Sequence, residues 1–588
     1  MVKYKSEQNK ETKMGKGPYP RSLHSAAGNG SLLVVTDSGA SWGNWNIVKE
    51  TVLLALEHFG FPYRTIDLAK QRLEKADLTD CAALVLAQDR IGASLTEKEA
   101  DLISSAVKET GLGLVVLDPD LRSFPRRLLE IFGFNRINPA PYTTDTLLVN
   151  DNSHYITGMQ NCNEFHRFDR MVSAIMVEEW GAQTTPLVQA ILGKEQLILA
   201  RHLVPNSAFM PGNYPVLFAA RYGKGKAIQF TISPRIWRRG FFGHCRGIDD
   251  LFWRSIVWAA AKPFAANIIP PFVAISFDDC GGRHDFIYAD LLGQYGYIPM
   301  VSLFLKDVPA KLFPKIQKGL KSGAIQFNAH AFDYYNPMLY DFGRGEHNKE
   351  TLKRIFAFED AWWKKIGAFP GHTVRGHWGE YGVAALPFLK ERQRTYFCPL
   401  HGFGLLKSDY CSLDGYWPYN LSNCHYDYLP DDNDIYGFAA HSTRGNEDFL
   451  GGATVILGEN SVNDIEKAAG RAVSQVAHGL RAGFFAEMLT HEQRFNVLSL
   501  QEWERILKRI EELSRRYERI PTDYDQIGPY LKGKDGAWIS LSARSGNKIK
   551  IQLAGKTNVP LKISVFKDEG ETVNRTYRTI KPFEGTQG

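Results

Sequence analysis

Short apolar runs alternate with amphipathic segments along most of the chain, as strands alternate with helices in α/β proteins. Apolar runs rich in β-branched residues lie at 31–38, 81–88 and 111–120, and helical periodicity follows at 46–59 and 94–110. This order predicts a doubly wound parallel sheet. Four later runs add strands to it, and a helix through 248–261 closes the unit; the runs lie at 186–193, 195–202, 215–223 and 226–233.

A second alternation of strands and helices follows the prolines at 263, 270 and 271, which indicate a domain boundary. Its buried strands are expected at 273–279, 297–305, 324–332, 372–378, 395–400, 435–442 and 483–491. Six or seven strand–helix repeats in about 250 residues favour a (β/α) barrel over an open sheet, although periodicity alone does not separate the two.

The end of the chain changes character. Residues 498–520 predict an amphipathic helix whose apolar stripe is Trp503, Leu507, Ile510 and Leu513. The last 60 or so residues then alternate polar and apolar at period two, which predicts a small antiparallel β module. The expected organisation is a flexible tail at 1–29, an α/β domain at 30–264, a barrel at 265–525 and a β module at 526–588.

Composition narrows the function. The chain has 588 residues, 44% hydrophobic and 23% charged, with a net charge of +6, which is too mild over this length to indicate nucleic acid or an anionic membrane as partner. No apolar run approaches the roughly 20 residues that span a bilayer, and no hydrophobic segment follows the basic N-terminus. The seven cysteines are scattered without a CxxC pair, which fits a reducing compartment. We therefore expect a cytoplasmic protein.

Polar side chains end four of the expected barrel strands. Asp278 and Asp279 end the first, His330 lies at the end of another, Arg375 and His377 follow a third, and His491 ends the last. In a parallel barrel the carboxyl ends of the strands are where catalytic groups gather. Adjacent carboxylates after a buried strand are costly unless a cation or hydrogen bonds hold them, although an Asp pair that caps the next helix is the plain structural alternative.

These motifs carry a resemblance. Ser276-Phe277-Asp278-Asp279 resembles the first motif of the polysaccharide deacetylases with the NodB homology domain (carbohydrate esterase family 4), whose usual form is TFDDG. The segments 327–332, 374–379 and 488–491 resemble the second, third and fifth motifs, in the family's order over about 272–500. The resemblance implies a distorted (β/α)7 barrel and a metal-dependent hydrolase that removes N-acetyl groups from a polysaccharide or amino sugar.

The resemblance also implies roles for the motif residues. Asp278 would be the general base, Arg375 would orient it, and His491 would be the general acid. Asp279 and His330 would bind a divalent metal ion, expected to be zinc. The general chemistry agrees, because such an ion polarises an acyl oxygen and acidifies water, while a protonated histidine can donate to the leaving amine.

The second motif departs from the family. Its usual form places another histidine four residues after the first, and here that position is Tyr334, a poor ligand for a catalytic zinc. Asp333, Asn328 and His377 are the candidates for the remaining ligand. We rank His377 first because imidazole suits the ion and the residue lies close to a strand end. A degenerate metal site is the other outcome of this departure.

The first unit is similar to the class I glutamine amidotransferase-like superfamily, in its non-catalytic ThuA-like or trimerisation-domain branch. The segments at 31–40, 84–103 and 221–239 carry this resemblance. The enzymes of that superfamily place a cysteine after the third strand, whereas here the comparable strand at 114–119 has no cysteine nearby, so glutaminase chemistry is not expected. The expected role is scaffolding, ligand recruitment or an interface for a homo-oligomer.

Other readings of the same residues stay open. A catalytically silent carbohydrate-binding or assembly protein would use the same folds. The paired carboxylates could serve a glycoside hydrolase if Glu487 were the partner from another strand. Cys280 is a poor candidate nucleophile because neighbouring carboxylates raise a thiol pKa. Trp378 and Trp417 offer flat faces for a sugar ring, or simply pack in the core.

Overall fold

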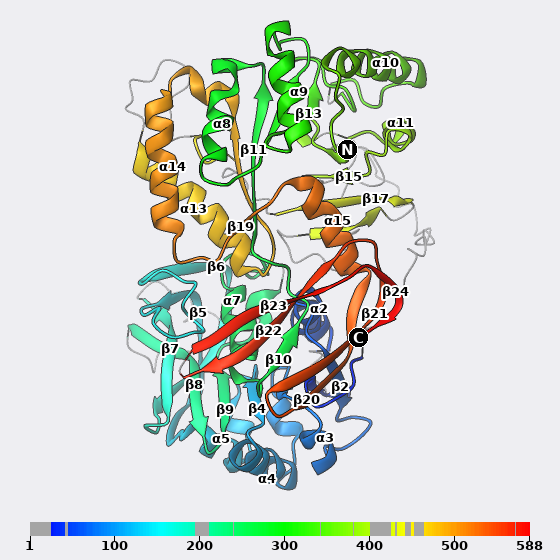
Figure 1. The fold of residues 1–588 in the computed structure, drawn as a ribbon. Helices are drawn as coiled ribbons and strands as arrows, with labels where there is room; N and C mark the ends of the chain where they lie inside the picture. Colours follow the sequence, from blue (N-terminus) through cyan, green and yellow to red (C-terminus); the bar gives the residue numbers. More distant parts are fainter. Residues whose placement is uncertain are drawn as a thin grey trace, which may run out of the picture.

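The structure is a computed structural model, which describes residues 25–40, 45–193, 211–238, 240–341, 343–379, 381–399, 425–429, 432–440, 448–451, 464–570 and 572–588. Figure 1 shows an N-terminal half (blue to cyan) below a second half (green to orange). The C-terminal strands (red) run across the N-terminal half. The expected strand at 195–202 lies outside the described residues.

The N-terminal half is built on a nine-stranded sheet of order β2-β1-β3-β4-β9-β8-β7-β5-β6. Its strands are β1 (Leu32–Thr36), β2 (Tyr63–Asp67), β3 (Ala83–Leu86), β4 (Gly113–Val116), β5 (Arg136–Val149), β6 (Glu164–Glu179), β7 (Thr184–Leu192), β8 (Gly212–Tyr222) and β9 (Gly225–Phe230). Strands β1 to β4 and β9 pair in parallel, as predicted. β1, β3 and β4 are buried throughout, which explains why their sequence reads as continuous apolar runs.

Strands β5 to β8 correct the prediction of a parallel sheet, because they pair antiparallel. The reason is visible at β8 and β9, where Tyr222 pairs with Gly225 and only two residues connect the strands. Such a connection can join only antiparallel neighbours. Strands β5 and β6, which together form a long hairpin, were not predicted.

Helices cover both faces of this sheet, as a doubly wound fold requires. One core gathers side chains of α4 and α5, and the core on the other face gathers those of α2 and α7. The helices of this half are α1 (Trp45–Val48), α2 (Leu54–His58), α3 (Lys75–Thr79), α4 (Glu97–Ser105), α5 (Arg126–Phe132) and α7 (Asp249–Ala259).

The described residues of the second half form two sheets. One has the order β13-β12-β11-β18, with β19 beside β11, and is wholly parallel; the other has the order β14-β15-β17-β16. The strands are β11 (Phe272–Cys280), β12 (Pro299–Phe304), β13 (Gln326–Ala331), β14 (Thr373–Val374), β15 (Tyr396–Phe397), β16 (His425–Leu429), β17 (Asp432–Ala439), β18 (Ala486–His491) and β19 (Ile520–Pro521). The α/β class is confirmed, and the closed barrel stays a prediction.

The helices of the second half are α8 (Ile287–Gly293), α9 (Phe313–Ser322), α10 (Lys349–Ile366), α11 (Leu386–Glu391), α13 (Ile465–Arg481), α14 (Leu500–Ser514) and α15 (Tyr524–Asp535). Helix α14 agrees with the predicted stripe, because Trp503, Leu507 and Ile510 are buried in the core of this half. It begins at Ser499, whose hydroxyl accepts from Glu502 N–H in a capping box, a cap that stabilises a helix by about 1 kcal/mol.

The C-terminal β strands form two small antiparallel sheets, which agrees with the predicted β module. They are β20 (Ala537–Ser545), β21 (Lys548–Thr557), β22 (Leu561–Glu569), β23 (Thr572–Ile580) and β24 (Phe583–Gln587). Strand β10 (Phe264–Ala266), in the predicted boundary segment, pairs with β22 and is buried. The predicted domain limits are not tested by these contacts and stay predictions, as does homo-oligomer formation.

Within the described ranges, no helix combines the length and the apolar character needed to cross a lipid bilayer.

Candidate active site

A β-bulge at the end of β11 turns two consecutive aspartates toward one place. Phe277 pairs with Val301 of β12 and Cys280 with Leu303, so Asp278 and Asp279 together face a single residue of the neighbouring strand. Asp279 takes a left-handed conformation with φ of +58°, which is uncommon for residues other than glycine and is better tolerated by aspartate. Neighbouring side chains on a regular strand point to opposite faces. The bulge overrides that alternation.

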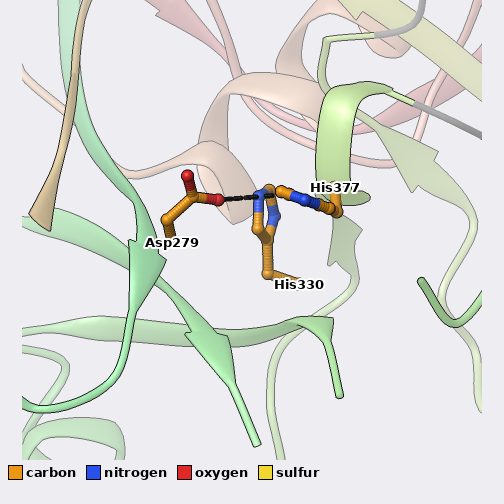
Figure 2. Close-up of side chains that lie close together, drawn as sticks. All are labelled: Asp279, His330 and His377. Atoms are coloured by element: carbon orange, nitrogen blue, oxygen red, sulfur yellow. Dashed lines mark ion pairs between the residues drawn. The ribbon is translucent and has the colours of Figure 1, made fainter. Parts of the chain in front are cut away.

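Three side chains from separate elements meet at Asp279 (Figure 2). His330 Nε2, from β13, lies 3.4 Å from Asp279 Oδ1, and His377 Nδ1, which follows β14, lies 3.1 Å from the same oxygen. One ligand-type atom from each of the three residues lies within 4.8 Å of the others. Within the described part of the chain, this is the one group of three or more such residues.

Backbone carbonyls fix which nitrogen of each imidazole faces Asp279. His330 Nδ1 lies 2.9 Å from the carbonyl oxygen of Arg375, and His377 Nε2 lies 3.2 Å from that of Tyr334. A carbonyl only accepts, so these nitrogens carry the hydrogens. In the neutral rings the other nitrogens therefore present lone pairs to a carboxylate oxygen. Histidine ligands of metals are oriented by outer hydrogen bonds of this kind.

The charge balance of the group also fits a cation. Burial by itself would raise the pKa of Asp279, but His330, His377 and His491 outweigh burial when their imidazoles are protonated, and they then hold that pKa well below its usual range. Asp279 Oδ1 is buried and receives no hydrogen bond of regular geometry from the described residues. Two imidazoles and a carboxylate are a common ligand set for zinc in hydrolytic sites. Asp279, His330 and His377 therefore fit a divalent ion of zinc type.

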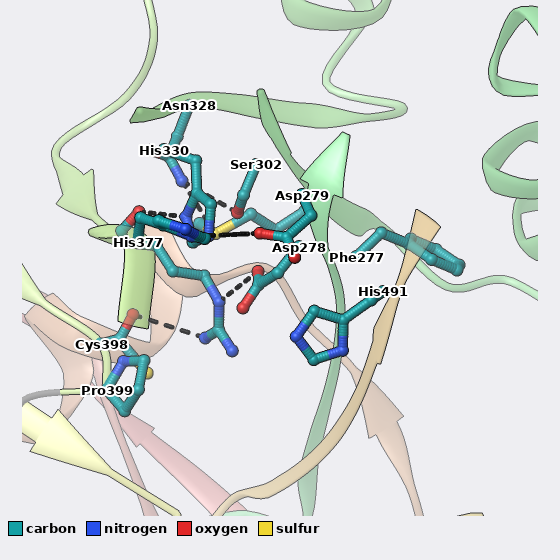
Figure 3. Close-up of polar contacts among 12 residues, drawn as sticks. Phe277, Asp278, Asp279, Ser302, Asn328, His330, His377, Cys398, Pro399 and His491 are labelled. Carbon is teal, nitrogen blue, oxygen red and sulfur yellow. Dashed lines mark hydrogen bonds and ion pairs between the residues drawn. The ribbon is translucent and has the colours of Figure 1, made fainter. Parts of the chain in front are cut away.

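Asp278 is held by a buried guanidinium (Figure 3). Arg375 Nε donates to Asp278 Oδ1 at 2.7 Å, and Arg375 Nη1 donates to Glu487 Oε1, also at 2.7 Å. Burial alone would raise the pKa of Asp278, but the charge of Arg375 outweighs it and lowers that pKa. Asp278 is thus a carboxylate near neutral pH, with a fixed rotamer.

Glu487, the candidate partner for glycoside hydrolysis, contacts Arg375 and Tyr524. Its Oε1 accepts from Arg375 and from the hydroxyl of Tyr524 at 2.6 Å. The side chain is almost fully buried. Glu487 therefore binds Nη1 of the guanidinium, while Asp278 binds Nε.

His491 is paired with an aspartate that the sequence did not single out. His491 Nδ1 donates to Asp448 Oδ2 at 2.8 Å, and Arg494 Nε donates to the same oxygen at 2.7 Å. Burial lowers the pKa of His491, but the hydrogen bond and charge of Asp448 outweigh it, so the pKa is raised. Asp278 pairs with His491 in the β11–β18 register, and Figure 3 shows the imidazole on the side of the Asp278 carboxylate.

All of the predicted site residues lie in this one region. Of the three candidates for the remaining ligand, only His377 joins Asp279 and His330. Asn328 donates to Ser302 Oγ, and Asp333 lies near Lys306 and accepts from Asn336. Tyr334 contributes its backbone carbonyl to His377.

Sequence reasoning missed four residues at this site. Asp448 lies 43 residues before its partner His491, and Tyr524 lies 37 residues after Glu487, so no local pattern connects them. Glu492 and Gln493 do have a signal, since they directly follow the last strand end, and both contact the segment 279–283.

Two further hypotheses concerned Cys280 as a nucleophile and Trp378 and Trp417 as faces for a sugar ring. The Cys280 thiol is buried, and burial together with Glu492 raises its pKa well above the usual value, which disfavours the thiolate that a nucleophile needs. Trp417 and the side chain of Trp378 lie outside the described residues.

Comparison with solved structures finds distant similarity to two deacetylases. No family profile matches the chain, and no curated protein matches its sequence. A solved structure assigned as a polysaccharide deacetylase from Mycobacterium smegmatis is similar at 12% identity and a TM-score of 0.31, over 49% of this chain and 98% of that one. The Bc1960 peptidoglycan N-acetylglucosamine deacetylase is similar at 12% identity and a TM-score of 0.25, over 44% and 90%.

Proposed function

We propose that this chain is a metal-dependent hydrolase that removes N-acetyl groups from a carbohydrate or amino sugar. The observation that carries the proposal is the convergence of Asp279, His330 and His377, with Asp278 and His491 beside them. The carbohydrate part of the proposal rests on the resemblance of the four strand-end motifs to those of polysaccharide deacetylases.

Asp279, His330 and His377 would be the protein ligands of the cation. A divalent ion bound there would polarise an acyl oxygen and lower the pKa of a water molecule, which is the chemistry that amide hydrolysis needs at neutral pH. The carbonyls of Arg375 and Tyr334 keep both imidazoles in the orientation that this binding requires.

Asp278 is the group that takes a proton from the attacking water. Its ion pair with Arg375 keeps it ionised, and the guanidinium is itself fixed by Glu487. Since Arg375 is 1% exposed, solvent screens the Arg375–Asp278 ion pair little, and the two side chains are fixed relative to each other. The same bond fixes which carboxylate oxygen of Asp278 remains available to water.

His491 is the group that gives a proton to the leaving amine. An amine leaves from a tetrahedral carbon only when it is protonated, so the acid must be charged at working pH. Asp448 raises the pKa of His491 and keeps Nδ1 occupied. The transferable proton is therefore on Nε2, the nitrogen not engaged with Asp448.

The test is acetate release from N-acetylated chitooligosaccharides by the purified chain, after its bound metals have been quantified. We expect one divalent ion per chain, acetate release that a chelator abolishes and zinc restores, and a loss of about 10²-fold or more in Asp278→Asn with the metal retained. Asp285→Asn is the matched control, because Asp285 is half-exposed and pairs with Lys311.

Two results would contradict the proposal. If the chain binds no metal above background at neutral pH, the alternative of a catalytically silent carbohydrate-binding or assembly protein is favoured. If Asp278→Asn releases acetate as fast as Asp285→Asn, the assigned base is wrong.

A further inference from the structure

The two residues after His491 reach back to the strand end that carries Asp279. Gln493 Nε2 donates to Asp279 Oδ2 at 3.1 Å. Glu492 accepts from the N–H groups of Gly281, Gly282 and Arg283, at 2.5, 3.1 and 2.8 Å. Together they bind the end of β18 to the end of β11.

Gln493 determines how Asp279 presents its carboxylate. Oδ1 faces the nitrogens of His330 and His377, while the amide of Gln493 occupies Oδ2 on the other side. A free carboxylate can turn and offer both oxygens to a cation. Tetrahedral zinc sites use one oxygen, so a donor on the second oxygen fixes the useful rotamer.

The contact with Asp279 is also what holds the Gln493 side chain. Its Oε1 is buried and accepts no hydrogen bond from the described residues. An unsatisfied amide oxygen is costly, so the environment of Oε1 does not favour glutamine over an apolar residue at this position. The donor toward Asp279 is the feature that distinguishes glutamine here from an apolar side chain of equal size.

Glu492 fixes the backbone on which Asp279 stands. The chain turns sharply after Asp279, with a left-handed φ of +58° there and +96° at Gly282. The Glu492 carboxylate is 1% exposed and also accepts from the hydroxyl of Tyr288 at 2.7 Å. Four donors offset part of the cost of burying this carboxylate, and three of them are backbone groups of the turn.

We propose that Glu492 and Gln493 are positioning residues for Asp279, which hold its carboxylate with one oxygen toward a metal bound by Asp279, His330 and His377. The inference rests on the metal site of the proposed function. It goes beyond that function because it assigns the metal affinity partly to residues that do not ligate the ion.

The test is a titration of the metal-free chain with Co²⁺, followed by the visible absorption of the bound ion, and a competition titration with Zn²⁺. Gln493→Met keeps the length of the side chain and removes the donor. We expect its affinity for either ion to fall by about 10- to 100-fold. Gln501→Met, on the exposed face of α14, is the matched control and should bind as the wild type does.

Glu492→Gln tests the turn separately. The NH₂ group of the glutamine would face a backbone N–H of residues 281–283, so two donors would oppose each other. We expect faster amide hydrogen exchange at residues 281–283 and weaker Co²⁺ binding. Circular dichroism of the metal-free variants checks that they are folded. If Glu492→Gln does not fold, Gln493→Met decides alone.

The outcomes separate this inference from the proposed function. If the wild type binds Co²⁺ and Gln493→Met binds it equally well, the positioning role is wrong and the proposed function is untouched. If metal binding depends on Gln493 but no acetate is released, the proposed function fails and the positioning role stands. If the wild type binds neither ion, both are wrong.

Discussion

Replacing Arg375 by methionine would leave two buried carboxylates without the cation that lies between them. The guanidinium donates to Asp278 and Glu487 at 2.7 Å each, and the exposed fractions of the three side chains are 1%, 11% and 6%. Because these side chains are so little exposed, solvent screening weakens this ion pair much less than it weakens a surface pair. Breaking a buried pair by removing one partner costs about 3–5 kcal/mol, and we expect Arg375→Met to lower the free energy of unfolding by that amount near pH 7.

The loss should depend on pH with a defined sign. In the wild type the pKa of Asp278 is lowered, so its contribution to stability is present above the unfolded pKa and is lost as pH falls through the folded value. Without Arg375, the burial of Asp278 is offset less and raises the pKa of that carboxyl. The unfolded state then loses its proton first, so the variant becomes less stable as pH rises. The deficit should be larger at pH 8 than at pH 5.

Urea unfolding followed by tryptophan fluorescence measures the difference, from the shift in midpoint at a common slope. Arg505→Met, an exposed site on α14, is the control and should change the midpoint little. Adding Glu487→Gln to Arg375→Met removes one of the stranded charges, so the double variant should be less unstable than the two single effects added together. A cost below about 1 kcal/mol, or strict additivity, would refute the charge network described here.

Three further predictions concern the site. Asp448→Asn removes the charge that raises the pKa of His491; because the acid works only below its pKa, the alkaline limb of the kcat/KM profile should move to lower pH, and an unmoved limb would exclude Asp448 from this role. Zn²⁺ at 100 times its dissociation constant should stabilise the wild type by about 2.7 kcal/mol in the same urea assay and leave Asp279→Ala unchanged, whereas equal stabilisation of both would place the ion elsewhere. Cys280→Ala should retain activity within about threefold, and an inactive but folded variant would reopen nucleophilic catalysis by the thiol.

The residues at strand ends were predictable because parallel strands bring their carboxyl ends to one edge. Asp278, His330, Arg375 and His491 could be named from the apolar runs that precede them, and these runs became β11, β13, β14 and β18. The choice of His377 was likewise made from ligand chemistry and from its closeness to a strand end. The fold supplied its position, with the Tyr334 carbonyl as its anchor.

What the sequence did not reveal was fixed by longer-range contacts or by local irregularity. Alternation along a strand implies that Asp278 and Asp279 diverge, and the bulge that brings them together has no glycine at the bulged positions to mark it. Asp448 and Tyr524 join the site through contacts that span tens of residues. The antiparallel strands β5 and β6 were missed because exposed and part-buried residues interrupt their buried positions, which weakens the apolar signal.

The N-terminal half also contributes to the site, through the segment that leads into β18. Arg481, at the end of α13, is buried and makes a two-pronged ion pair with Glu164 of β6 at 2.7 Å. His58 Nε2 donates to the carbonyl of Ala482 at 2.7 Å, since a carbonyl oxygen only accepts. Burial lowers the pKa of His58. These contacts come from residues more than 300 positions away in the sequence and fix the chain just before the strand that carries His491.

Breaking this ion pair should therefore affect the acid more than the metal ligands. Glu164→Ala leaves Arg481 buried without its carboxylate, and we expect a loss of about 3 kcal/mol or more in stability. In the protein that remains folded, kcat should fall because the start of β18 shifts. Metal affinity should change less, since Asp279 and His330 stand on β11 and β13. Glu178→Ala, at the other end of β6, is the matched control, and equal kcat values in the two variants would show that the N-terminal half does not brace the acid.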